Sequence, residues 1–366
     1  MTHRIVVLGA GYAGLTAANR LAGHARHAQV TLINARSHFV ERVRLHQVAA
    51  GQQPREYPLR ERLRGTGIQL VIGQVQALDL DRRQVRLGHA TEAATVAYDT
   101  LVYALGSVAD TSQVAEHAYP VADLDSAREL SKRVPDLAAE RGVLAVVGGG
   151  LTGIETATEL AESYPQLRVH LVTAGQPGGW LSARGRAHLR RVFNRLGIEV
   201  RPDATVTKVG PDGVVLADGA TVEAGLTVWA AGFVAPTLAR QAGVAVDGNG
   251  RILVDDTLCS RSHPEIYAVG DSAAAHRAGG QQLRMSCATG LPTGQCAAAA
   301  ITTRLAGRQP SPLRFRYLIQ CISLGRRDGL IQLVHPDDNP HDRVLTGRAA
   351  ARVKELVVRG ALLATR

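Results

Sequence analysis

The sequence is poor in aromatic side chains and in lysine, and it has no long apolar run. Aromatic residues make up 4% of the 366 positions, and only Lys132, Lys208 and Lys354 are lysines, so arginine supplies almost all of the 42 basic residues. The net charge is +10, but few aromatics for base stacking and arginines interleaved with acids argue against a dedicated nucleic-acid groove. No apolar run approaches the roughly 18 residues of a membrane-spanning helix. We expect a cytoplasmic protein, because the apolar stretch after His3 and Arg4 starts a fold and is not a signal peptide.

The cysteines and histidines lack the spacing of metal or redox sites. The chain has four cysteines, which are Cys259, Cys287, Cys296 and Cys321. None forms a C-x-x-C pair, which excludes a zinc knuckle and a redox disulfide of that type. The closest histidines, His24 and His27, have no carboxylate or thiol at ligand spacing, and no G-x-S-x-G marks a nucleophile elbow. We therefore expect no metal and no catalytic side-chain nucleophile.

The same glycine pattern, G-x-G-x-x-G, occurs twice. The first copy, IVVLGAGYAG, holds Gly9, Gly11 and Gly14, and the second, LAVVGGGLTG, holds Gly148, Gly150 and Gly153. In each copy the first glycine permits a tight turn, the second lets the backbone approach a pyrophosphate, and the third lets a helix pack on a strand. The phosphates then lie at the helix N-terminus. Two copies predict two dinucleotide sites, and hence electron transfer between two bound cofactors.

The apolar pattern predicts an α/β fold with two Rossmann-like units. Strands at 4–8 and 29–33 enclose a helix with Leu15, Ala18 and Leu21 on one face, and strands at 143–147 and 167–172 enclose a second helix. Apolar and polar residues alternate in segment 68–103, which predicts antiparallel strands. Further helices are predicted at 123–141, 182–196 and 291–306, and the tail reads as a hairpin followed by a helix.

These elements predict three domains. Residues 1–112 and 234–306 form the first dinucleotide-binding domain, residues 113–233 form a second one inserted into it, and residues 307–366 form a small C-terminal α+β segment. An acidic residue commonly follows the second strand of such a unit and binds the ribose. Here Asn34 and Thr173 stand at those positions, so the choice between NADH and NADPH stays open.

Four further segments carry a family resemblance. They are YDTLVYALGS at 98–107, GIETATEL at 153–160, LTVWAAGF at 226–233 and IYAVGD at 266–271. With both glycine patterns, the chain resembles two-dinucleotide flavoproteins of the glutathione-reductase type. Within them it is most similar to type II NADH dehydrogenases and apoptosis-inducing-factor-2-like oxidoreductases. The resemblance implies bound FAD, with NADH or NADPH as co-substrate.

The resemblance also implies which residues bind each cofactor. For FAD these are Gly9, Gly11, Tyr12, Ala13, Gly14, Asn34, Arg36, Arg42, Val75, Gly106, Gly270 and Asp271. For NAD(P)H they are Gly148, Gly150, Thr152, Gly153, Glu155 and Gly232. Glu155 is expected near the contact between nicotinamide and flavin. Arg42 reads equally well as a surface arginine, and Val75 as a core strand residue.

Two departures from the family concern the electron acceptor. Disulfide reductases carry paired cysteines soon after the first glycine pattern, whereas residues 39–51 read FVERVRLHQVAAG. Type II NADH dehydrogenases tend to carry two glutamines one helical turn apart near the quinone; Gln295 is present, but Ala299 replaces the second. A quinone remains the leading acceptor. The alternatives are a ferredoxin- or rubredoxin-type reductase and an NADH-sensing flavoprotein without turnover.

The last helix has an amphipathic pattern. Its predicted apolar face consists of Val353, Leu356, Val357 and Ala361, with Arg348, Arg352, Lys354 and Arg359 around it. Such a basic helix is able to lie on the inner face of an anionic membrane. The alternative is a helix packed on the flavin domain. A second hypothesis places the N-terminus of the helix near Leu291 against the flavin ring. The oligomeric state is not predicted.

Overall fold

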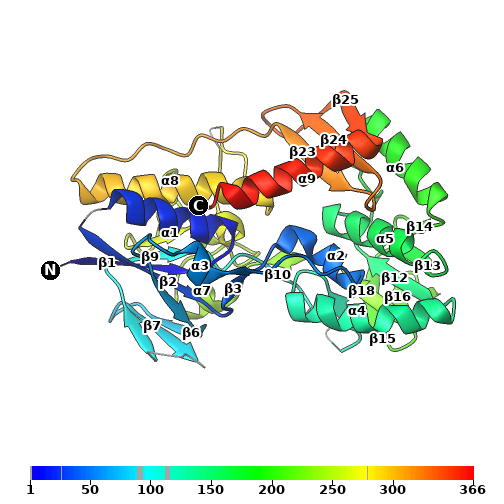
Figure 1. Ribbon diagram of the computed structural model, residues 1–366, viewed down its shortest axis with the longest axis horizontal. Coiled ribbons are helices and arrows are strands. Elements are labelled where there is room, and N and C mark those ends of the chain that lie inside the picture. Colours follow the sequence, from blue (N-terminus) through cyan, green and yellow to red (C-terminus); the bar gives the residue numbers. More distant parts are fainter. Residues whose placement is uncertain (1, 26, 89–93, 112–115, 278) are drawn as a thin grey trace.

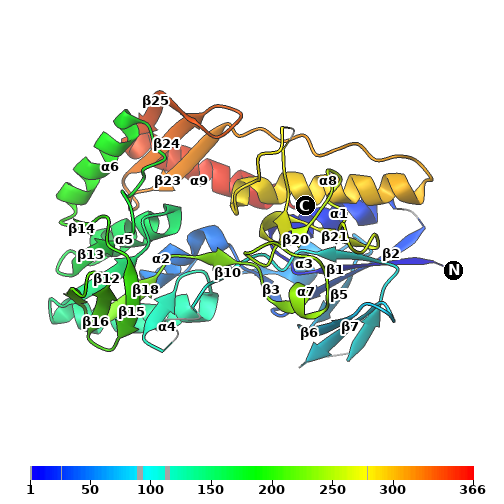
Figure 2. The same cartoon turned by 180° about the vertical axis from the view of Figure 1, so that it is seen from behind.

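In the computed structural model the chain forms two lobes joined by a C-terminal layer (Figures 1 and 2). The structure describes residues 2–25, 27–88, 94–111, 116–277 and 279–366. The domain boundary predicted between residues 112 and 113 therefore lies outside the described residues. Each lobe has a five-stranded sheet at its centre, and every strand pair in both sheets is parallel. This is the doubly wound α/β architecture that the two glycine patterns predict.

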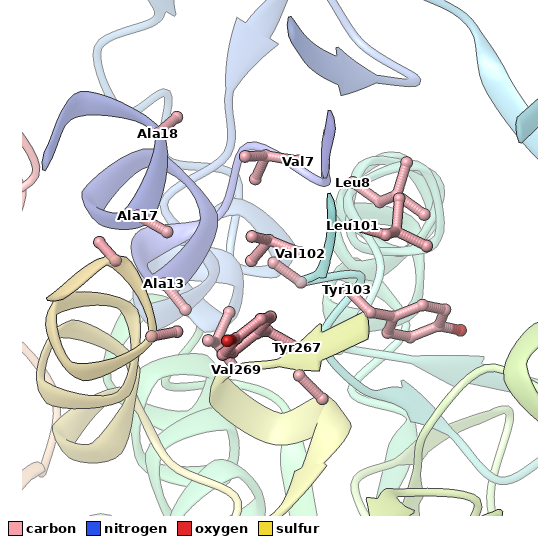
Figure 3. Close-up of a cluster of buried hydrophobic side chains, with 14 of the residues drawn as sticks. Val7, Leu8, Ala13, Ala17, Ala18, Leu101, Val102, Tyr103, Tyr267 and Val269 are labelled. Carbon is pink, nitrogen blue, oxygen red and sulfur yellow. The ribbon is translucent and has the colours of Figure 1, made fainter. Parts of the chain in front are cut away.

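The first lobe combines segments from both ends of the chain. Its sheet has the order β21-β9-β1-β2-β5 and consists of β1 (His3–Leu8), β2 (Ala28–Asn34), β5 (Gln69–Ile72), β9 (Thr100–Tyr103) and β21 (Ile266–Ala268). Two long helices lie together on one face of it, α1 (Tyr12–His24) and α8 (Cys287–Leu305) (Figure 1). Figure 3 shows Ala13 and Ala17 of α1 beside the buried Val7 and Val102 of the sheet. Small side chains on α1 thus let the helix pack closely on the strands.

Segment 68–103 is a partial correction to the sequence prediction. Only β6 (Gln74–Asp79), β7 (Gln84–Gly88) and β8 (Thr95–Ala97) pair as antiparallel strands. The flanking strands β5 and β9 instead join the parallel sheet, where they pair with β2 and β1. Alternating side chains identify a half-buried strand but not its partner, so the pattern could not separate the two cases.

The second lobe contains the second glycine pattern. Its sheet has the order β11-β18-β12-β13-β14 and consists of β11 (Ala118–Pro120), β12 (Val143–Val147), β13 (Arg168–Val172), β14 (Glu199–Arg201) and β18 (Leu226–Trp229). Its helices are α4 (Leu124–Ala139), α5 (Leu151–Ser163) and α6 (Ala183–Arg195). A small antiparallel sheet completes the lobe with β15 (Val206–Gly210), β16 (Gly213–Leu216) and β17 (Thr221–Glu223).

Short elements connect the lobes and border the first sheet. The chain passes between the lobes twice, and these passages pair as β10 (Val108–Ala109) and β19 (Phe233–Val234). The remaining short elements are β3 (His38–Phe39), η1 (Arg42–Arg44), α2 (Leu45–Ala49), β4 (Tyr57–Pro58), α3 (Leu59–Arg62), α7 (Leu238–Gln241), β20 (Ile252–Leu253), η2 (Gly270–Ser272) and β22 (Ala273–Ala274). Helix α2 extends from the first lobe to pack on α4 and α5 of the second.

The C-terminal layer is a three-stranded antiparallel sheet followed by a helix. The predicted hairpin is confirmed as β23 (Ile319–Ser323) and β24 (Gly329–Val334), and a third strand, β25 (Pro340–Thr346), was not predicted. Helix α9 (Gly347–Leu363) then runs back from this sheet towards α1 and α8 (Figure 1). Side chains of β23 and β24 join the core of the second lobe, while the end of α9 joins that of the first. The layer therefore bridges both lobes.

Candidate active site between two nucleotide-binding turns

Both glycine turns have a backbone that only glycine tolerates. Gly9 and Gly148 have φ values of +94° and +121°, in the left-handed region that side chains disfavour. A Cβ atom on Gly14 would lie 1.9 Å from the carbonyl oxygen of Gly9, and one on Gly153 would lie 1.8 Å from that of Gly148. Each helix thus begins very close to its strand, and the third glycine has nearly the same clearance in both copies.

The middle glycine of each turn faces open space. Gly11 and Gly150 precede the first residues of α1 and α5, and no protein atom lies within 4 Å of a Cβ built on either one. The first turn of each helix has no acidic residue, and no side chain caps its N–H groups. A helix N-terminus with free donors and room in front of it fits a pyrophosphate. Both turns therefore suit the predicted dinucleotides.

Asn34 supports the first turn from the end of β2. Its Oδ1 accepts a hydrogen bond from Ala10 N at 2.9 Å, and its Nδ2 donates to the carbonyl of Arg36 at 2.7 Å. The side chain is thus already engaged within the protein, and one lone pair and one N–H remain for a ribose. Arg36 reaches the other lobe, where its guanidinium pairs with Asp125 at 2.5 Å.

The segments after β9 and β21 meet beside the first turn. Ser107 Oγ donates to Asp271 Oδ2 at 2.7 Å, and Arg42 Nη1 donates to the carbonyl of Ser107 at 2.7 Å. Burial lowers the pKa of Arg42, while the charge of Asp271 opposes that shift. Arg42 is consequently a half-buried partner of these segments, which contradicts its reading as a surface residue. Gly106 and Gly270, with φ of +72° and +63°, turn the chain here.

Helix α8 adds Thr293, which the sequence placed only at the predicted helix start near Leu291. Gly270 N donates to Thr293 Oγ1 at 2.9 Å, so Thr293 fixes the turn before Asp271. The helix begins at Cys287, one turn earlier than predicted, and Pro292 lies inside it. The expected N-terminus near Leu291 is therefore wrong. Threonine had no motif to mark it, because its role depends on a strand that precedes it by more than twenty residues.

Glu155 lies where α5 meets the C-terminal layer. Its carboxylate forms an ion pair with Lys354 Nζ of α9 and accepts a hydrogen bond from Ser323 N at 2.9 Å. Burial raises the pKa of Glu155, but the Lys354 cation and the Ser323 N–H outweigh it, so the pKa lies below its ordinary value. Glu155 is therefore a buried carboxylate anion. Lys354 was predicted to lie among the exposed charges around the apolar face of the last helix. This prediction is wrong for Lys354, because the residue is only 9% exposed.

A second buried carboxylate lies one helical turn further along α5. Glu159 Oε2 is 2.8 Å from Arg326 Nη2, and its Oε1 accepts from Gln52 Nε2 at 2.5 Å. His46 of α2 lies between the carboxylates, with Nδ1 3.8 Å from Glu155 and Nε2 3.8 Å from Glu159. Burial is the main cause that lowers the pKa of His46 to about 3, so the imidazole is neutral. Residues from four elements thus form one buried ionic cluster.

The other predicted residues lie apart from this cluster. Tyr12 and Ala13 open α1, and the Tyr12 ring stacks edge-on against Phe39 at 5.0 Å. Val75 is half-buried in β6, Thr152 lies in the first turn of α5, and Gly232 follows β18 with a φ of +64°. Gln295 is half-buried in the middle of α8, and its side chain makes no hydrogen bond to any described residue.

The thiols do not offer a redox centre. Burial raises the pKa of Cys259, and it raises the pKa of Cys296 and of Cys321 to about 11, so these thiols stay protonated at neutral pH. All four cysteines are free. Within the described residues no group of three His, Cys, Asp or Glu side chains is arranged to hold a metal ion.

Comparison with known proteins gives one consistent family. The family model described as pyridine nucleotide-disulphide oxidoreductase matches residues 3–298. An NADH dehydrogenase-like protein of Mycobacterium tuberculosis is 32% identical over 347 residues, covering 88% of this chain and 86% of its own. A type II NADH:quinone oxidoreductase of Staphylococcus haemolyticus is 26% identical, covering 97% and 94%.

A solved structure shows the same fold over the whole chain. The NDH2 of Plasmodium falciparum in complex with NADH aligns with a TM-score of 0.83 at 16% identity, covering 100% of this chain and 96% of that one. The agreement confirms the two-lobe dinucleotide-binding architecture. It includes the C-terminal layer, which the family model does not reach.

Proposed function

The chain belongs to the pyridine nucleotide-disulphide oxidoreductase family, and we propose that it passes electrons from NADH or NADPH to a quinone. It is an FAD-dependent NAD(P)H oxidoreductase without a redox disulfide. When bound, the flavin accepts hydride from the reduced nicotinamide and returns the electrons to the acceptor. Overall, NAD(P)H, a quinone and one proton give NAD(P)⁺ and the quinol.

The two glycine turns support the binding part of this proposal. We assign FAD to the turn of Gly9, Gly11 and Gly14, because Asp271 and Arg42 gather beside it. NAD(P)H is assigned to the turn of α5. On this assignment residues 113–233 are an inserted nicotinamide-nucleotide domain, linked to the flavin domain by the β10–β19 pair. Arg42 then supplies a fixed positive charge, and the Ser107 hydroxyl orients the Asp271 carboxylate.

The observation that carries the acceptor assignment is the Glu155–Lys354 ion pair. Glu155 lies at the start of the nicotinamide-binding helix α5, and Lys354 belongs to the layer that bridges both lobes. Formation of a quinol requires protons beside the reacting oxygens, and a lysine held as a cation offers one at Nζ. The quinone is further supported by the names of the staphylococcal relatives.

An anaerobic titration tests this function. We expect the flavin absorbance of the purified protein to bleach with NADH or NADPH and to return on addition of menadione. Reoxidation by a ferredoxin, with menadione inert, would replace the quinone by an acidic electron-carrier protein as acceptor. A protein that bleaches but turns over with neither acceptor would be a nucleotide sensor. Absence of bound flavin after reconstitution would refute the proposal.

We also propose that α9 brings the protein to a membrane surface. Leu356, Val357 and Leu363 are 67%, 42% and 59% exposed, which is unusual for such side chains on one helix. Arg359 lies beside them and favours anionic lipid headgroups. In the described part of the chain, no helix has the length and apolar character needed to cross a bilayer. The contact would therefore be peripheral.

A further inference from the structure

A cavity of about 480 Å³ opens beside the Glu155–Lys354 pair. Its walls come from three places in the chain: residues 43–47, the turn between β23 and β24, and the first half of α9. Figure 1 shows these segments meeting where the C-terminal layer crosses between the lobes. The volume lies within the range of about 300–1,000 Å³ typical of small-molecule sites.

The lining of this cavity is strongly cationic. Six basic side chains line it, which are Arg44, Arg326, Arg327, Arg348, Arg352 and Lys354, and its one acidic side chain is Glu355. Glu355 is already held by Arg44 at 2.8 Å and by Arg359 at 2.8 Å. A ligand that enters the cavity therefore meets no free carboxylate on its walls.

Half of these cations have no protein counter-ion. Arg326 and Lys354 are neutralised by Glu159 and Glu155, as Arg44 is by Glu355. By contrast, the side chains of Arg327, Arg348 and Arg352 form no ion pair or hydrogen bond with any described residue. Unpaired like charges around one concave space attract a counter-ion, and the effect is strengthened because low-dielectric walls focus the field.

The same walls also hold apolar surface. Val43, Ala351 and Val358 line the cavity together with the arginines, and Val358 is buried. Guanidinium groups bind carboxylates and sulfonates through paired N–H donors and stack on aromatic faces. An apolar wall opposite such donors suits a flat ring that carries an anionic substituent.

We propose that this cavity binds an anionic aromatic acceptor, namely a quinone that bears a carboxylate or sulfonate group. Arg348 and Arg352, one helical turn apart on α9, hold the anionic group, and the ring points towards Lys354 at the inner end. The inference rests on the proposed quinone function and narrows it from quinones in general to anionic ones. Arg327, Arg348 and Arg352 are exposed, so beside a neutral quinone they would keep water as their only partner, whereas an anionic substituent would form ion pairs with them.

Binding of a redox-inert probe tests the inference without turnover. The probe is naphthalene-2-sulfonate, its neutral counterpart is naphthalene-2-sulfonamide, and both are titrated calorimetrically into the flavin-loaded protein. We expect the sulfonate to bind at least about tenfold more tightly, and added salt to weaken it. In the variant Arg348→Gln/Arg352→Gln this preference should disappear. The control Arg190→Gln/Arg191→Gln, which removes two exposed charges on α6, should keep it.

The outcomes separate this inference from the proposed function. Equal binding of both probes, or an unchanged preference in the Arg348/Arg352 variant, would overturn the anionic site even if menadione is reduced. Failure to reduce any quinone, with the sulfonate preference intact, would refute the quinone function and leave an anion site. Phosphatidylglycerol vesicles form the third arm, with phosphatidylcholine vesicles as their control. Displacement of the sulfonate by phosphatidylglycerol alone would assign the arginines to lipid headgroups and overturn the small-molecule proposal.

Discussion

Alanine substitutions in the two glycine turns should show which turn binds FAD and which binds NAD(P)H. In each turn the middle glycine, Gly11 or Gly150, has space around its Cβ position, whereas the third, Gly14 or Gly153, has none. The middle position should therefore report cofactor binding alone. The third position should report both folding and binding. Because the turns are nearly identical in geometry, each variant in one turn has a matched control in the other.

The magnitudes follow from the distances. A methyl group on Gly153 would lie 1.8 Å from a backbone oxygen, so helix and strand must separate by more than an ångström. Overpacking of this kind costs about 1–3 kcal/mol. Gly150 has φ −75° and an extended ψ, which alanine adopts readily. There the entropy lost from the unfolded chain, worth about 0.4–1 kcal/mol, roughly offsets the weaker helix cap.

The assay combines flavin absorbance, thermal unfolding and anaerobic NADH titration. We expect Gly150→Ala to stay yellow with an unchanged unfolding midpoint, and to bind NADH at least about tenfold more weakly, which corresponds to about 1.4 kcal/mol. Gly11→Ala should instead lose flavin while its fold persists. If Gly150→Ala loses flavin, or binds NADH as tightly as the unsubstituted protein, the assignment of the second turn is wrong.

Three further predictions concern the C-terminal layer and the cluster beneath it. Lys354→Met should lower the free energy of unfolding in urea by about 3–5 kcal/mol, because it leaves the Glu155 carboxylate buried without its cation. Adding Glu155→Gln should recover part of that loss, and no recovery would contradict the pairing. His46 has a pKa of about 3 in the folded protein and about 6.5 when unfolded, so its contribution is complete above pH 6.5 and is lost as the pH falls towards 3. Between pH 6.5 and 5 the unfolding free energy should fall by about 2 kcal/mol more than in His46→Gln, and equal slopes would refute a buried neutral imidazole. Leu356→Glu should weaken sedimentation with phosphatidylglycerol vesicles about tenfold or more, since a buried leucine contributes about 1.5–3 kcal/mol. Leu318→Glu, at an exposed leucine outside α9, is the control, and an equal effect of both would argue against α9 as the contact.

Local patterns predicted the two strand–helix–strand units well. β12 has the predicted limits, β1 and β13 differ from theirs by one residue at one end, and β2 is one residue longer at each end. Each of these elements is specified by neighbours in the sequence: an apolar strand, a glycine turn and a helix with small residues facing the sheet. The α/β fold class is accordingly confirmed by the structure and by its solved neighbour.

Elements that depend on distant partners were harder to predict. A helix start was predicted near Leu291, yet α8 begins at Cys287 and contains Pro292. The observed helix has a local contact in its first turn and a contact with another helix. Thr289 Oγ1 closes the first turn on Ser286 O at 2.8 Å, and Gly294 lies against the Ala13 carbonyl of α1. The sequence does not reveal that pairing of helices.

The burial of Lys354 in the site could not be predicted from the sequence either. In a helix pattern a lysine beside arginines belongs to the solvent face, and only a buried partner changes that. The partner, Glu155, is 199 residues away in the chain. The resemblance had marked Glu155 but offered no cation for it. Likewise, Arg326 was read only as a turn residue, although its guanidinium pairs with the buried Glu159.

The buried carboxylates of α5 determine how the C-terminal layer must behave. Glu155 and Glu159 are one helical turn apart, and each receives its cation from that layer, through Lys354 and Arg326. Detaching the layer would leave two buried carboxylates beside a neutral imidazole. Breaking only one of the two ion pairs already costs several kcal/mol of stability. The layer therefore cannot open as a mobile lid unless the carboxylates of Glu155 and Glu159 become protonated. It follows that the cationic cavity, whose walls include both Lys354 and Arg326, is a fixed part of the folded protein.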